Sequence, residues 1–226
     1  MSFEKIKPTN FDLFATVFYP SSCFCCRTDT NMCVYVCDQC AEKLNKLKTK
    51  RTKTVSYYGN SFTIHSVFYY KDEASAAVKM LKFTFSPDGA KAMGDYIAEK
   101  ASRLRTQDFD LVAAVPMTVK KVVIRGYNQA ELIGKQVSRY YKIPFNRKCL
   151  KKIRETKPQH TLSGIERRIN IRNAYTATAD VKGKHILLID DVATTGATLC
   201  ECATTLLNAG ARRVTLMTFA ATKYSN

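Results

Sequence analysis

An apolar run that ends in two acids and a turn of small residues most constrains the fold of this chain. Residues 186–199 read ILLIDDVATTGATL, and the first four have the composition of a strand buried on both faces. Asp190 and Asp191 end that strand, where we expect both to be exposed. The helix that follows is expected to have one apolar face, made of Leu199, Cys202, Leu206 and Ala209. The segment therefore predicts a buried parallel strand, a tight turn and a helix.

The predicted turn suits a phosphate group, because backbone N–H groups and threonine hydroxyls can converge there in front of the positive end of the helix dipole. It consists of Val192, Ala193, Thr194, Thr195, Gly196, Ala197 and Thr198. The carboxylates of Asp190 and Asp191 stand beside it and can accept hydrogen bonds from neighbouring hydroxyls or bind a divalent metal. A phosphate next to a diol describes a 5-phosphoribosyl group. The alternative is an ordinary buried strand followed by a turn and a capped helix.

Residues 186–199 closely resemble the 5-phosphoribosyl-1-pyrophosphate (PRPP) motif of type I phosphoribosyltransferases. The resemblance implies that Asp190 and Asp191 hold the ribose hydroxyls and that residues 192–198 bind the 5-phosphate. It also implies the fold class: α/β, with a twisted, mainly parallel sheet and helices on both faces. Residues 110–116 and 214–219 are two further apolar runs that fit buried strands of such a sheet.

A basic loop is expected at the same edge of the sheet. Lys120, Lys121, Arg125 and Gly126 follow the apolar run 110–116 and precede a helix that begins near residues 127–129. Ligands of open α/β sheets bind at the carboxyl ends of the strands, so this loop should face the phosphate turn. Arg125 would then give a bidentate fork to the pyrophosphate of PRPP, and Gly126 would allow close backbone approach. The alternative is a basic surface turn. If the chain acts on PRPP, we expect Asp190, Asp191 and Arg125 to be its catalytic residues.

Further patterns predict the elements around that edge. The residues on one side of a two-residue alternation, which predicts a strand pair, are Phe62, Ile64 and Phe68. Residues 74–85 and 90–104 have helical spacing, and residues 87–89 between them are expected to form a turn. Lys82 in the first helix is either solvated or able to reach a ligand.

Two CxxC pairs, separated by ten residues, predict a metal site. The four cysteines are Cys23, Cys26, Cys37 and Cys40. Four thiolates around one ion are typical of structural Zn²⁺, which leaves no open position for chemistry. An iron–sulfur cluster and a group of free thiols are the alternatives. Cys25 and Cys33 are left over, and Cys25 could replace Cys26 as a ligand.

The chain has a formal net charge of +17, which favours polyanionic partners such as nucleic acid, an acidic membrane surface or a phosphorylated ligand. Charged residues interrupt the N-terminus and no apolar run is long enough to span a bilayer. We therefore expect a cytoplasmic protein without a membrane span, whose cysteines are thiols or metal ligands.

Basic residues concentrate in two segments. Residues 43–53 contain six cations and no acid, which indicates a solvated hinge or a linker that lies on a nucleic-acid backbone. Residues 150–173 are expected to form a flap over a charged ligand. The candidate DNA-binding residues are Lys148, Lys151, Lys152, Arg154, Lys157, Arg167 and Arg168. Tyr140 and Tyr141 stand beside them as candidate stacking platforms for single-stranded DNA.

In their order along the chain, the motifs resemble those of the ComF family of competence-associated, phosphoribosyltransferase-like proteins. The motifs are the cysteine ribbon, LKF at 81–83, RGYNQ at 125–129, TKPQ at 156–159, RRIN at 167–170 and the PRPP motif. The resemblance implies a role in natural transformation, in the handling of incoming single-stranded DNA in the cytoplasm, with binding of PRPP and Mg²⁺. A competence helicase or another DNA-uptake protein is a further candidate partner. We expect a ribbon and basic linker in residues 1–55 and a phosphoribosyltransferase-like domain in residues 56–226.

Two other functions are compatible with the same motifs. One is a conventional phosphoribosyltransferase of nucleotide salvage, a glycosyltransferase that joins a base to PRPP. The other is a PRPP sensor without enzymatic activity, whose ribbon docks a partner protein. The first predicts steady release of pyrophosphate with one base, and the second predicts ligand binding without turnover.

Overall fold

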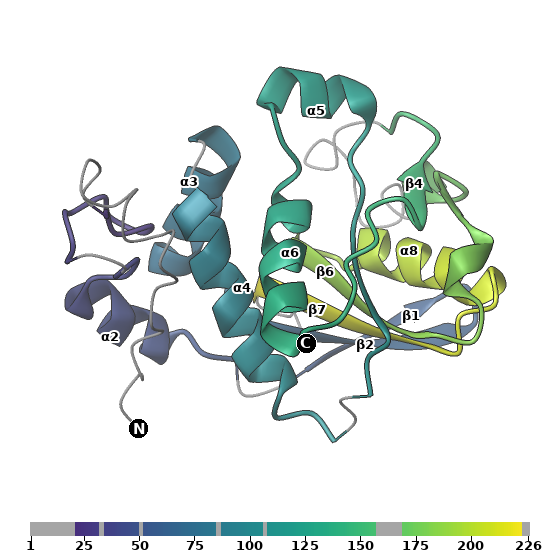
Figure 1. Cartoon of the computed structure of the whole chain (residues 1–226), viewed down its shortest axis with the longest axis horizontal. Helices are drawn as coiled ribbons and strands as arrows, with labels where there is room; N and C mark the ends of the chain where they lie inside the picture. Colours follow the sequence, from purple (N-terminus) through teal and green to yellow (C-terminus); the bar gives the residue numbers. More distant parts are fainter. Residues whose placement is uncertain are drawn as a thin grey trace.

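A computed structural model describes residues 21–31, 34–49, 52–84, 87–105, 108–156 and 169–222. Its centre is a five-stranded sheet in the order β1-β2-β7-β6-β3 (Figure 1). The strands are β1 (Lys53–Tyr57), β2 (Asn60–Tyr69), β3 (Leu111–Ala114), β6 (His185–Ala193) and β7 (Arg213–Ala221). β1 and β2 are antiparallel, and all other neighbours in this sheet are parallel. The predicted mainly parallel α/β sheet is confirmed.

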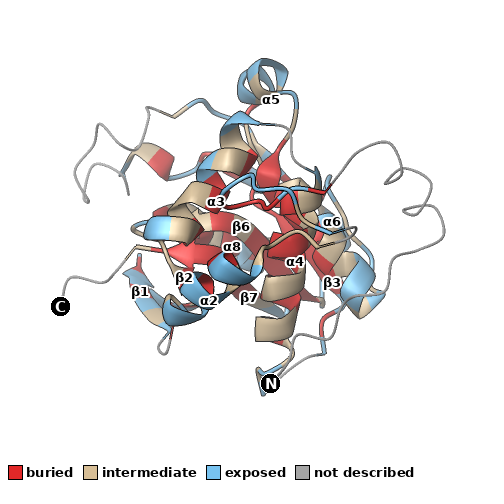
Figure 2. Cartoon of the chain, turned by 90° about the vertical axis from the view of Figure 1, so that its left-hand side faces the viewer, coloured by how far each residue is buried: buried red, intermediate tan, exposed pale blue. Residues whose placement is uncertain are grey.

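Helices cover both faces of the sheet, so its inner strands are buried on both sides. One face packs against α3 (Asp72–Phe83), α4 (Pro87–Ala101) and α6 (Gln129–Tyr141). The other packs against α8 (Ala197–Asn208) and a hairpin of β4 (Leu150–Lys152) and β5 (Tyr175–Ala177). Residues 186–189 of β6 are 0% exposed, and β6 is red in Figure 2. The expected buried strand is confirmed.

The helix α4 begins at Pro87, so the prediction of a turn over residues 87–89 is wrong. Proline is favoured in the first helical turn, because its missing N–H has no partner inside the helix there. A proline between two helical patterns therefore marked the start of the second helix.

Phe62, Ile64 and Phe68 do not share one side of the sheet. Phe62 and Ile64 pack with α8, whereas Phe68 packs with α3 and α4. β1 pairs with β2 only as far as Ile64, and beyond it Thr49 N donates to Val67 O (2.9 Å). The alternation of side chains along β2 breaks where β2 changes its pairing partner. Val67 and Phe68, neighbours in the chain, both lie in the cluster that packs with α3 and α4.

The cysteine-containing segment packs into the main core. Phe24 is 2% exposed, and its ring meets that of Phe219 in β7 edge-on with centroids 6.1 Å apart. The basic run that follows extends from the last turn of α2 (Asp38–Lys46) to the first residue of β1. Within α2, Lys43 Nζ lies 3.1 Å from Glu73 Oε1 in α3. The interpretation of this run as a hinge is therefore wrong for its described part. Lys50 and Arg51 lie outside the described residues.

The loop expected around residues 120–126 is mostly a short helix, α5 (Val119–Arg125). It contains no glycine or proline, and Gly126 ends it with φ 84° in the left-handed region. None of its residues is buried, and it stands out from the molecule in pale blue in Figure 2. The remaining described helix is a 3₁₀ turn, η2 (Ala179–Val181). Within the described ranges, no helix combines the length and apolar character needed to cross a membrane.

Candidate functional site

The turn after β6 encloses a small pocket at the carboxyl end of the sheet. Its lining consists of Asp190, Val192, Ala193, Thr194, Thr195, Gly196, Ala197, Thr198 and Leu199. The helix α8 begins at Ala197, so its N-terminal N–H groups border the pocket. The structure thus brings together nearly all residues that the sequence predicted for phosphate binding.

Gly196 is required at the corner of this turn for two reasons. Its φ is 83°, which side chains rarely adopt. A Cβ there would also lie 2.6 Å from Ile64 Cδ1 and 3.1 Å from Val55 Cγ2. The turn is therefore pressed against the β1–β2 hairpin.

A lysine from β1 supports the turn from outside. Lys53 Nζ donates to Thr194 O at 2.6 Å, and Thr222 Oγ1 donates to the same carbonyl at 3.2 Å. Burial lowers the pKa of Lys53. The sequence analysis placed Lys53 in the basic run, and nothing in the local sequence connects it with a turn about 140 residues away along the chain.

The two acids face different surroundings. Asp190 lines the pocket, and its Oδ1 accepts a hydrogen bond from Asp191 N at 2.9 Å. Asp191 is 8% exposed, and its Oδ2 lies 3.1 Å from Lys82 Nζ of α3. Neighbouring residues of a strand point to opposite faces, which explains the separation. The expectation that both acids are exposed is wrong, because Asp191 is buried and Asp190 half-buried.

Charge in this acid pair is only partly balanced. Burial, reinforced by the Asp191 carboxylate, raises the pKa of Asp190 well above its usual value. Burial alone would lower the pKa of Lys82, but the Asp191 carboxylate raises it. A site with two adjacent carboxylates and one lysine can still accept a divalent cation, which binds carboxylate oxygen. The donor set therefore fits Mg²⁺.

Arg125 and Gly126 are not among the residues that line the pocket. They lie at the end of α5, where Arg125 is half-buried and Gly126 is exposed. The structure does not bring the arginine of the RGYNQ motif to the phosphate turn.

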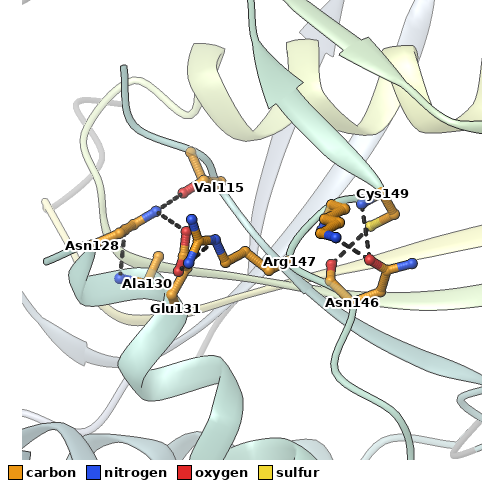
Figure 3. A network of polar contacts seen from close by, with 8 residues as sticks. Val115, Asn128, Ala130, Glu131, Asn146, Arg147 and Cys149 are labelled. Atoms are coloured by element: carbon orange, nitrogen blue, oxygen red, sulfur yellow. Dashed lines mark hydrogen bonds and ion pairs between the residues drawn. The ribbon is translucent and has the colours of Figure 1, made fainter. Parts of the chain in front are cut away.

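The rest of that motif connects elements near the site. The Tyr127 hydroxyl donates to Leu81 O and to Thr84 O, the latter at 3.2 Å, and so holds the end of α3 that carries Lys82. Asn128 caps α6, because its Oδ1 accepts from Ala130 N at 3.0 Å (Figure 3). Asn128 Nδ2 donates to Val115 O at 3.0 Å, which anchors the cap to the end of β3. The motif thus connects the LKF segment at the end of α3 with the sheet.

Gln129 is a residue that the sequence analysis did not single out. It is 3% exposed, and its Nε2 has no hydrogen-bond partner within the described part of the chain. A buried unpaired donor costs about 1–3 kcal/mol. Its only signal in the sequence is its place in the RGYNQ motif.

The two CxxC pairs converge on one point. The sulfur atoms of Cys23, Cys26, Cys37 and Cys40 all lie within 4.8 Å of one another. Cys26 Sγ and Cys37 Sγ are 3.8 Å apart, and the edge of a tetrahedron with metal–sulfur distances of ~2.3 Å is about 3.8 Å. The four-cysteine cluster can therefore hold a metal ion, and its geometry fits Zn²⁺.

The structure selects Cys26 over Cys25 for this cluster. Cys26 Sγ lies within 4.8 Å of the sulfur atoms of Cys23, Cys37 and Cys40, and Cys25 is not part of this group. The Thr28 hydroxyl lies 3.2 Å from Cys26 Sγ. Cys33 lies outside the described residues.

The cysteine cluster also contacts the helix that carries Lys82. Arg27, one residue after Cys26, donates from Nη2 to Thr84 Oγ1 at 2.8 Å and from Nε to Met80 Sδ at 3.0 Å. The metal-binding segment and Tyr127 thus hold the same end of α3.

The candidate DNA-binding residues are only partly described. Lys148, Lys151 and Arg154 are exposed, and Lys152 is half-buried. Arg154 Nη2 donates to Asn170 O (2.9 Å) and Arg172 O (2.7 Å), so it also holds the backbone. Lys157, Arg167, Arg168 and half of the expected flap lie outside the described residues.

Comparison with known proteins adds to this geometry. Residues 111–225 match the family model of the phosphoribosyl transferase domain. The chain is 32% identical over 154 residues to Competence protein F of Haemophilus influenzae, covering 65% of this chain and 67% of that protein. It is 31% identical over 149 residues to DNA utilization protein YhgH of Escherichia coli (strain K12), covering 64% and 66%. The match to Competence protein ComFC of Bacillus subtilis is 28% over 145 residues, covering 64% and 58%. The chain thus spans about two thirds of the length of most of these relatives.

Solved structures of similar fold are more distant in sequence. The glutamine PRPP amidotransferase of B. subtilis, in complex with ADP and GMP, aligns with a TM-score of 0.43 and 20% identity. That alignment covers 62% of this chain and 30% of the other. The adenine phosphoribosyltransferase of Leishmania tarentolae aligns with a TM-score of 0.38 and 19% identity, covering 61% and 59%.

Proposed function

The chain belongs to the phosphoribosyltransferase family, as a member of the ComF family of competence proteins, and we propose that it binds PRPP with Mg²⁺ and handles incoming single-stranded DNA in the cytoplasm during natural transformation. The observation that carries the proposal is the pocket between Asp190 and Thr198, which combines carboxylate, hydroxyl and helix N-terminal N–H groups at one strand end. These are the groups that recognise a sugar phosphate.

In this proposal each part of the site has one task. The N–H groups and threonine hydroxyls of residues 194–198 bind the 5-phosphate. Asp190 and Asp191 hold the ribose hydroxyls and would hold Mg²⁺, which when bound supplies positive charge to the pyrophosphate. Lys82 forms an ion pair with Asp191 and offers a second cation to that end of the ligand.

The basic surface supports the DNA part of the proposal. Lys148 and Lys151 are exposed and free to follow a phosphate backbone. The names of the relatives, which include two competence proteins and a DNA utilization protein, point the same way. The four-cysteine cluster, with no open ligand position, would hold Zn²⁺ for structure rather than for chemistry.

The direct test is isothermal titration of the chain with PRPP and Mg²⁺. Asp190→Asn with Asp191→Asn should abolish measurable binding, and Asp180→Asn, a change of an exposed acid in η2, should not affect it. Urea unfolding of each variant separates loss of the site from loss of the fold. An unchanged affinity for PRPP in the double variant would show that Asp190 and Asp191 do not form the PRPP site.

A pyrophosphate assay with and without single-stranded DNA then separates the three functions. Steady pyrophosphate release with one base would identify a salvage enzyme. PRPP binding without release would leave the competence protein and the sensor. Salt-dependent DNA binding favours the former, since contacts to phosphates weaken steeply as the salt concentration rises.

A further inference from the structure

A second pocket lies beside α8, between the β1–β2 turn and the β4–β5 hairpin. The lining residues that matter here are Tyr58, Ile153, Arg172, Tyr175, Glu201 and Asn208. Its lining on α8 begins at Glu201, whereas the lining of the phosphate pocket ends at Leu199. The two pockets share no lining residue, so the second pocket is separate from the first.

Tyr58 stands in this pocket at a conformational cost. It is 52% exposed and has φ 44°, in a two-residue turn with Gly59 at φ 81°. Asparagine or glycine is preferred at such a position, and a bulky residue there is an outlier. The Tyr58 ring meets the buried Tyr57 ring edge-on, with centroids 4.8 Å apart. More than half of Tyr58 nevertheless stays exposed, so part of its surface is available to a ligand.

Cations accompany the aromatic rings of the pocket. The Arg172 guanidinium carbon lies 4.8 Å from the centre of the Tyr58 ring. Lys152 Nζ lies 5.6 Å from the centre of the Tyr175 ring and also donates to Thr156 Oγ1 at 2.8 Å. Lys151, on the same hairpin, is exposed.

The acid in the pocket does not cancel this charge. Among the described residues that line the pocket, Glu201 is the one acid, and it is 6% exposed. Its Oε2 accepts from the Tyr57 hydroxyl at 2.8 Å, and its Oε1 accepts from Asn173 N at 2.6 Å. Apart from neutral threonine and asparagine residues, the groups left to a ligand are aromatic, apolar and cationic.

We propose that this pocket takes an unstacked base of single-stranded DNA, which stacks on Tyr58 beside Arg172 and Ile153. Exposed Ile153 offers apolar contact to the base, and Lys151 binds a neighbouring phosphate. Aromatic rings combined with cations are the groups that bind single strands without sequence preference. The inference rests on the proposed role in DNA handling and gives that role a site. Because the two pockets share no lining residue, PRPP and DNA should bind together rather than compete.

The test compares the binding of a labelled oligothymidylate with that of an abasic strand of the same length, by fluorescence anisotropy. The full-length wild-type chain should prefer the oligothymidylate. Tyr58→Asn should remove this preference, with a loss of about 5- to 150-fold in affinity for the oligothymidylate, as expected for one stacked base. The urea midpoint of Tyr58→Asn should equal or exceed that of the wild type, because asparagine suits the turn. Val123→Asn, which changes an apolar residue that is 76% exposed on α5, is the control and should keep the preference.

Each other outcome has a defined meaning. A preference that survives Tyr58→Asn, or is lost in Val123→Asn instead, overturns the pocket. Equal binding of both strands by the wild type also overturns it, but leaves DNA handling through the backbone intact. If the wild type binds neither strand, the DNA part of the proposed function fails as well, whereas PRPP titration still tests the other pocket. Displacement of the oligothymidylate by PRPP would contradict separate sites.

Discussion

Lys82 Nζ of α3 lies 3.1 Å from Asp191 Oδ2 at the end of β6, so the second acid of the PRPP motif is paired with a cation from another element. Its partner in sequence, Asp190, faces the phosphate pocket instead. One acid is thus balanced by the protein, and the other is left for a ligand.

Replacing Lys82 with methionine should weaken PRPP–Mg²⁺ binding by about 10- to 100-fold. The reason is that a hydrogen bond to a charged group contributes ~1.5–3 kcal/mol. Lys82→Arg should retain most of the affinity, and Lys79→Met, a change of an exposed lysine on the same helix, is the control. Isothermal titration measures all three. Equal affinities for Lys82→Met and wild type would mean that Lys82 serves only to balance Asp191.

Asp190→Asn should stabilise the fold at neutral pH. The pKa of Asp190 is raised in the folded chain, so the folded state binds this proton more tightly than the unfolded state does. Its contribution to stability is present below the unfolded pKa, about 3.9, and is lost as pH rises through the folded pKa. Asparagine does not titrate. The free energies of unfolding of variant and wild type, measured with urea, should therefore diverge in favour of the variant as pH rises from 4 to 8, by about 1.4 kcal/mol for each unit by which the pKa is raised. Asp180→Asn should run parallel to the wild type, and the same behaviour in Asp190→Asn would show that burial does not penalise its charge.

Gly196→Ala should destabilise the chain and disrupt the phosphate turn. The added Cβ meets Ile64 Cδ1 at 2.6 Å as well as requiring a left-handed backbone. We expect a loss of about 2–5 kcal/mol, from ~1–2 for the backbone and ~1–3 for overpacking. Gly183→Ala isolates the backbone part, because Gly183 has φ 72° but no atom within 4 Å of the added Cβ. Equal losses in urea unfolding would show that the Ile64 contact relaxes without cost.

The cysteine cluster should bind one zinc ion per chain. Cys37→Ser or Cys40→Ser should lower the zinc content measured by elemental analysis and lower the urea midpoint, since structural zinc contributes to folding free energy. Cys25→Ala, a change in the same segment outside the cluster, should keep the ion. Zinc retained by Cys37→Ser but lost from Cys25→Ala would reverse the assignment of ligands.

The features that could be predicted from the sequence are those that depend on a few neighbouring residues. The strand at 186–189, the turn at 192–198 and the two CxxC pairs each carry their information within a few residues. The pairing of Lys82 with Asp191 joins positions 109 apart, and that of Lys53 with Thr194 joins positions 141 apart. Such contacts depend on how helices and strands pack, which periodicity does not encode.

Errors in prediction arose where one residue type has two structural uses. Pro87 was read as a turn signal and is the first residue of a helix. Lys43, Lys46 and Lys48 are exposed, as expected for a solvated basic run, whereas Lys53 of the same run is partly buried beneath the turn. The segment of Arg125 was expected to be a loop but forms α5, and binding of pyrophosphate by Arg125 stays a prediction.

The edge-on contact between Phe24 and Phe219 limits how this chain can be shortened for experiments. A fragment that starts at residue 56 would cut through β1 and expose one side of the Phe219 ring to water. It would also lack Lys53, whose ammonium group holds Thr194. Work on residues 56–226 in isolation would therefore report on a damaged protein, and reagents for ligand screening should retain the cysteine segment.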